Sequence, residues 1–136
     1  MNYEAVYQTV KTKVSALVPT AAVCLPNQRP AEPKETEIGI SVTEIDSNPY
    51  TEVEMKRDVS IDLLTSVPVG EGTERIHHIV SKLVAAFDPL QDGSFWAGTR
   101  EYFVRIRSAG QRQPSITDTR YQINVRILAT IYIERS

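Results

Sequence analysis

A long alternation of apolar and polar residues near the C-terminus constrains the fold of this chain more than any other feature. From Tyr121 to Ile133 every second residue is apolar. Successive side chains on a strand point to opposite faces of a sheet, so the alternation predicts one long strand with a buried face. The opposite face carries mainly polar side chains: Gln122, Asn124, Arg126, Thr130 and Glu134. The buried face needs a second layer of structure to cover it.

Two stretches have the apolar spacing of helices that can form such a layer. Residues 2–18 and 73–87 place apolar side chains three and four positions apart. Pro19 is expected to end the first helix. Thr73 is the expected N-cap of the second, and Glu74 suits the positive end of its helix dipole.

Four further segments have strand character. They are residues 20–25, 36–46, 51–67 and 100–108. Ile45 breaks the apolar alternation of its segment, which predicts a bulge or the end of the strand there. The segments between these elements, residues 26–35, 88–99 and 109–117, have no periodicity and are predicted to be loops.

The order of elements is therefore α-β-β-β-α-β-β. A chain of 136 residues is expected to form one domain, residues 1–136. Short turns between consecutive strands favour antiparallel pairing. The predicted fold is an α+β domain with a mainly antiparallel sheet of about five strands and two helices packed on one face.

Composition excludes several classes of function. The net charge is −2, so no strongly basic surface for bulk nucleic-acid binding is expected. The single cysteine, Cys24, allows no disulfide within the chain and suits a reducing compartment, the cytosol. No apolar run has the length of a signal peptide or a membrane span.

The sequence contains no legible catalytic, cofactor-binding or metal-binding arrangement. His77 and His78 are adjacent on the second helix, so they point about 100° apart and cannot share a metal ion. Gly70 and Gly72 form a G-x-G before that helix, but Arg75 stands where a phosphate loop needs a small residue. We therefore expect no cofactor and no enzymatic activity.

Charged side chains are the main candidates for contacts with other molecules. Arg105, Arg107 and Arg126 lie on the polar faces of the last two strands. Three interpretations are open: they pair with acids of the same sheet, they form salt bridges to a neighbouring subunit, or they form a wall that faces an anionic polymer. The acids of the strand at residues 51–67 form either a solvated face or the partner of such arginines: Glu52, Glu54, Asp58 and Asp62.

Three residues in the predicted loops are also interface candidates. Phe95 and Trp96 lie between two glycines in the segment 88–99. They either close the end of the core or anchor a partner. Arg112 lies in the segment 109–117 and adds a further cation.

The order of elements resembles the tail terminator, or tail completion, proteins of long-tailed bacteriophages. The resemblance rests on an amphipathic helix before "VCLPNQRPAEP", a long hairpin, the helix of "VGEGTERIHHIVSKLVAAF" and the final regular strand. These segments span nearly the whole chain.

The resemblance implies a structural virion protein that forms a ring, as a hexamer, on the head-proximal end of the tail tube. Such a ring stops tube polymerisation and joins the neck, so the implied partners are further copies, the tail tube protein and a neck or head-completion protein. The resemblance further implies that the protein is made in the host cytoplasm and is found at the head–tail junction of the virion. DNA would pass through the ring without sequence-specific binding, and no membrane would be involved. Two alternatives stay open: another head–tail connector protein, and a small ligand-binding or enzymatic domain.

Overall fold

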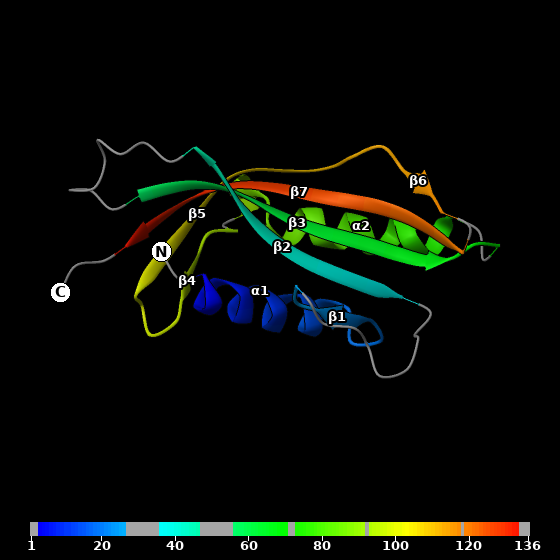
Figure 1. The fold of residues 1–136 in the computed structure, drawn as a ribbon, viewed down its shortest axis with the longest axis horizontal. Helices are drawn as coiled ribbons and strands as arrows, with labels where there is room; N and C mark the ends of the chain where they lie inside the picture. The colour runs from blue at the N-terminus through cyan, green and yellow to red at the C-terminus, as the bar shows by residue number, and fades with distance from the viewer. Residues whose placement is uncertain are drawn as a thin grey trace.

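Two helices cover one face of a curled seven-stranded sheet in the computed structural model (Figure 1). The structure describes residues 3–26, 36–46, 56–70, 73–91, 93–117 and 119–133. The α+β class and the two covering helices are confirmed. Neither described helix is long and apolar enough to cross a membrane.

The elements follow the predicted order, with additions after the second helix. The helices are α1 (Glu4–Leu17), α2 (Glu74–Ala86) and the short 3-10 helix η2 (Pro89–Gln91). The strands are β1 (Ala22–Cys24), β2 (Glu37–Asp46), β3 (Lys56–Pro68), β4 (Phe95–Ala97), β5 (Tyr102–Gln111), β6 (Ser115–Ile116) and β7 (Arg120–Ile133).

The strand order is β1-β2-β3-β7-β5-β4, with the short β6 paired to β7. The alternating C-terminal segment, β7, therefore lies inside the sheet between β3 and β5. The predicted count of about five strands was too low, because β4 and β6 form within segments expected to be loops. Antiparallel pairing dominates, as predicted, with the exception of β1 and β2, which run parallel.

One hydrophobic core lies between the sheet and both helices. From α1 it takes Val6, Val10 and Val14, and from α2 it takes a stripe that includes Ile76 and Leu83. The inward side chains of β7 are buried as predicted: Ile123, Val125, Ile127, Ala129 and Ile131. The flanking Tyr121 and Ile133 are partly exposed.

Two bulges change which side chains reach the uncovered face. The register of β2 against β3 shifts between Glu44 and Asp46, so the bulge predicted at Ile45 is confirmed. The register of β5 against β7 shifts between Ile106 and Ser108. At the start of α2, Thr73 occupies the N-cap position as predicted, but its side chain makes no capping hydrogen bond.

Candidate functional site on the helix-free face of the sheet

The face of the sheet opposite the helices carries three clusters of bonded polar side chains. Its side chains come from alternate positions of β2, β3, β5 and β7, because one parity of each strand is used by the core. Asp58 and Asp62 of β3 and Arg126 and Thr130 of β7 lie on this face. We call this surface the helix-free face.

Asp62 is the centre of one polar cluster on the helix-free face. Its Oδ1 accepts hydrogen bonds from Asn124 Nδ2 at 2.8 Å and from Arg126 Nε at 3.1 Å. Its Oδ2 accepts one from Ser60 Oγ at 3.1 Å. Three donors on one carboxylate fix its position and neutralise its charge locally.

Asp58 is the centre of a second cluster, toward the other end of β3. Its Oδ1 accepts a hydrogen bond from Thr130 Oγ1 at 2.7 Å and lies 3.5 Å from an Arg107 guanidinium nitrogen. Arg107 is the extra residue of the β5 bulge, and its side chain remains 62% exposed. The pair is therefore open to solvent on the arginine side.

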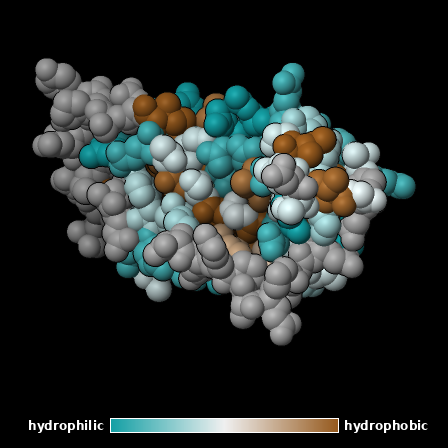
Figure 2. All heavy atoms as spheres, turned by 45° about the vertical axis from the view of Figure 1, so that its right-hand side comes forward, coloured by the Kyte–Doolittle hydropathy of each residue, from teal (hydrophilic) through white to brown (hydrophobic). Residues whose placement is uncertain are grey.

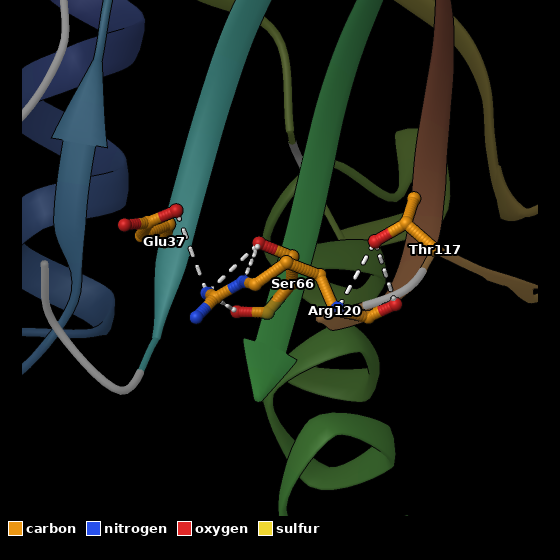
Figure 3. Close-up of polar contacts among 4 residues, drawn as sticks. All are labelled: Glu37, Ser66, Thr117 and Arg120. Atoms are coloured by element: carbon orange, nitrogen blue, oxygen red, sulfur yellow. Dashed lines mark hydrogen bonds and ion pairs between the residues drawn. The ribbon is translucent and has the colours of Figure 1, made fainter. Parts of the chain in front are cut away.

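Arg120 forms the third cluster by reaching from β7 over β3 to β2 (Figure 3). Its Nη2 donates to the Ser66 carbonyl oxygen at 2.9 Å and to Ser66 Oγ at 3.0 Å. The same nitrogen lies 3.5 Å from a Glu37 carboxylate oxygen. At its backbone, the Arg120 amide donates to Thr117 Oγ1 at 3.0 Å, which ties the β6 turn to the start of β7.

These contacts show which of the arginines pair with acids of the same sheet, a question that the sequence left open. Arg107 and Arg126 pair with Asp58 and Asp62 of the same sheet, as the first interpretation expected. Arg105 is exposed, and no described residue bonds to its side chain. A glutamate at position 126 would face Asp62, so a charge reversal of Arg126 would disturb the sheet as well as any interface.

The remaining candidates are dispersed. Phe95 and Trp96 lie on β4 and not in a loop. Phe95 is buried against Phe87 with ring centroids 6.3 Å apart, so it closes the core, whereas Trp96 is 40% exposed. Arg100 lies over the Trp96 ring, 5.6 Å from its centroid. The predicted candidates Glu52 and Glu54 lie outside the described residues.

Two hollows open on the helix-free face. One has a volume of about 430 Å³ and lies beside Lys56, Arg105 and Arg107. The other has a volume of about 500 Å³ and lies beside the Asp62 cluster. It is lined by Thr43, Ile45, Ser60, Asp62, Arg112, Arg126 and Leu128. Arg112 is thereby placed next to Arg126, which the sequence did not indicate.

The sequence reasoning missed Glu37, Ser66 and Arg120. Glu37 and Ser66 are direct register partners, and Ser66 has the same parity as Asp62 on β3. That parity was a usable signal, but the partner strand and register that bring Arg120 to them follow only from the fold.

Only two described groups have a clearly shifted pKa. Burial, followed by the hydrogen bond to Glu44, raises the pKa of the Tyr3 hydroxyl. Burial, followed by the charge of Glu37, raises the pKa of the Cys24 thiol. Neither group lies in either hollow. Within the described ranges, no three His, Cys, Asp or Glu side chains group as metal ligands would.

Hydrophobic side chains form several separate groups among hydrophilic ones on the surface seen in Figure 2. A third hollow, of about 310 Å³, is lined by Val69, Ile116 and Tyr121 with neighbouring residues of the same end of the sheet. Val69 is 50% exposed and Ile116 69% exposed. Apolar side chains this open are candidates for contact with another molecule.

Comparison with known proteins shows the fold alone. No family model and no curated protein matches the sequence. One solved structure superposes with a TM-score of 0.66 at 15% identity, covering 97% of this chain and 92% of its own, and its designation states no activity or partner. A similar fold is therefore found in another solved protein. The evidence on function comes from the surfaces of this chain.

Proposed function

We propose that this chain is a structural virion protein that forms a ring on the head-proximal end of a bacteriophage tail tube. In this role it stops tube polymerisation and provides the joint to the head or neck, and it catalyses no reaction. The proposal starts from the resemblance in the order of elements to tail terminator proteins. The surfaces of the folded chain add independent support.

The observation that carries the proposal is the charge balance of the helix-free face. Arg107, Arg120 and Arg126 each lie within 3.5 Å of a carboxylate oxygen of the same sheet. A wall past which DNA slides must not hold phosphates, because each free cation would add a salt-dependent contact to the backbone. The paired arginines keep the part of this face around β3 and β7 close to neutral, so this part suits the lining of a DNA channel, whereas Arg105, which no described residue binds, lies on β5.

Exposed apolar side chains outside that face suit contacts with other virion proteins. Val69 follows β3, Leu90 lies on η2 and Ile116 on β6, and the exposed fractions are 50%, 90% and 69% respectively. They lie at strand ends and connections, which are the parts of a ring subunit that project toward the tube or the neck. A single ring needs heterologous contacts that close on themselves.

Two measurements test the proposal in sequence. Immunogold electron microscopy with antibody to this chain should label only the head–tail junction of phage particles from the source. Label elsewhere, or protein found only free in the cell, contradicts a junction role.

Tube capping then separates a terminator from a neck protein. Purified tail tube protein is polymerised with and without this chain, and tube lengths are measured by negative-stain microscopy. A terminator should arrest elongation and appear at one tube end. A neck protein would label the same junction on particles yet leave bare tubes growing at an unchanged rate.

A further inference from the structure

The outer edge of β5 is covered for only part of its length. β4 pairs with Tyr102–Val104, and Ser94 Oγ accepts the Ile106 amide hydrogen bond at 3.0 Å. Beyond Ile106 no strand in the described part of the chain pairs with β5 on the side away from β7. Residues 107–111 are therefore a strand edge that no described strand covers.

The direction of the amides on this edge follows from one hydrogen bond. The Arg112 amide donates to the Asn124 carbonyl oxygen of β7 at 2.8 Å. Amides alternate in direction along an antiparallel strand, so those of Gln111 and Ala109 point away from β7. No described residue accepts a hydrogen bond from either amide. They are placed to bind an added strand.

A cationic hollow lies beside the same edge. The 430 Å³ hollow is lined by three cationic side chains, Lys56, Arg105 and Arg107, and by one carboxylate, Asp58. Asp58 already accepts a hydrogen bond from Thr130 and pairs with Arg107. With Arg107 paired to Asp58, the Arg105 guanidinium is a cation of this hollow that no described residue binds.

We infer that the β5 edge accepts an extended acidic segment of a second copy of this chain as an added strand. Main-chain hydrogen bonds to Ala109 and Gln111 would supply affinity, and a carboxylate entering the hollow beside Arg105 would supply specificity. The inference rests on the proposed function, since it identifies the contact through which ring subunits associate.

Charge distribution identifies a second copy as the occupant. Residues 1–68 carry ten Asp and Glu against six Lys and Arg, whereas residues 69–136 carry seven against nine. One copy therefore carries an acidic excess in its first half and a basic excess in its second, and this charge asymmetry is the pattern of a heterologous contact.

A proline at position 111 tests the main-chain part of the inference. Gln111→Pro removes the outward amide, and proline is tolerated on an edge strand when its missing N–H faced solvent. The matched control is Gln111→Ala, which removes only the side chain. By analytical ultracentrifugation, Gln111→Pro should raise the concentration for half-assembly at least about tenfold, and Gln111→Ala should leave it unchanged. Equal assembly of both variants overturns the edge contact.

Amide hydrogen exchange tests the same contact on the unaltered chain, so misfolding of the proline variant cannot hide the answer. The amides of Ala109 and Gln111 should exchange fast in the monomer and slowly in the assembly. Fast exchange in both states contradicts strand addition.

Charge reversal tests the hollow. Arg105→Glu should weaken assembly about tenfold, whereas Lys82→Glu, on the exposed side of α2, should not. Equal behaviour of the two variants removes the hollow from the contact. If all these variants assemble and cap tubes like the wild type, the edge inference fails while the proposed function stands. If the wild type neither assembles nor caps tubes, the proposed function itself fails.

Discussion

Asp62 and Arg126 are direct register partners across β3 and β7, and the Arg126 Nε donates to Asp62 Oδ1 at 3.1 Å. The pair lies in the middle of the helix-free face, where no helix shields it. The Asp62 side chain is nevertheless only 19% exposed, while that of Arg126 is 41% exposed. The acid is thus the enclosed member, and the arginine covers it.

Removing Asp62 should destabilise the sheet. Asp62→Ala leaves Asn124, Arg126 and Ser60 without their acceptor, and we expect the free energy of unfolding to fall by about 1–2 kcal/mol, discounted for the exposure of the arginine. Urea denaturation measures the change. Glu101→Ala, at an exposed site, is the control and should stay within about 0.5 kcal/mol of wild type. Equal stability of the two variants would show that the cluster contributes nothing.

Replacing Arg120 by lysine should show how much the planar guanidinium group contributes to stability beyond its positive charge. Arg120→Lys keeps the cation but replaces with a single nitrogen the planar pair Nε and Nη2, which together donate to the hydroxyl and the carbonyl oxygen of Ser66. We expect a loss of about 1 kcal/mol in thermal or urea unfolding. Glu37→Ala should cost less, because its carboxylate lies 3.5 Å from the guanidinium at a partly exposed position. The reverse ranking would show that the ion pair dominates.

Gly93 should not tolerate a side chain. A Cβ at this position would lie 2.6 Å from the Phe87 carbonyl carbon, within backbone that ends α2. Gly93→Ala should lower the free energy of unfolding by about 1–3 kcal/mol because backbone has to shift. Gly110→Ala is the matched control, since a Cβ there meets nothing within 4 Å. A Gly93→Ala protein as stable as the control would contradict this close approach.

Stability should fall at alkaline pH because of Tyr3. Burial and the hydrogen bond to Glu44 raise its pKa in the folded chain. An unfolded tyrosine loses its proton near pH ~10 while the folded one retains it, so above that pH the unfolded state binds fewer protons and is favoured. The contribution is fully present below pH ~10 and is lost as the pH rises further. Tyr3→Phe should flatten the decline in urea-unfolding free energy between pH 9 and 11. An unchanged slope would exclude Tyr3 as its source.

Side-chain periodicity predicted the parts of the fold that bury long, regular stripes. The alternation at 121–133, the two helices and the bulge at Ile45 were all legible, because each depends on local parity alone. The parallel pairing of β1 and the formation of β4 were not legible. Both strands have three residues, too few for a period, and they form because longer neighbours offer free edges.

For the polar clusters, the sequence predicted which side of each strand is polar but not which side chains pair with each other. The sequence placed Asp58, Asp62 and Arg126 on polar sides of their strands, but not which acid meets which arginine. Those pairs depend on the register between β3 and β7, two strands about sixty residues apart in the chain. The bulge that directs Arg107 toward Asp58 has no local sequence signal comparable to that at Ile45.

The Tyr7 hydroxyl occupies the place of a neighbouring strand at the edge of β2. It accepts a hydrogen bond from the Val42 amide at 2.9 Å and donates one to the Val42 carbonyl oxygen at 3.4 Å. The chain itself thereby takes up the backbone groups of β2 at Val42, whereas no described strand covers the second half of β5. The two sides of the sheet are thus unlike, so copies that meet through them form heterologous contacts, and the rotation between successive copies decides whether these contacts close into a ring.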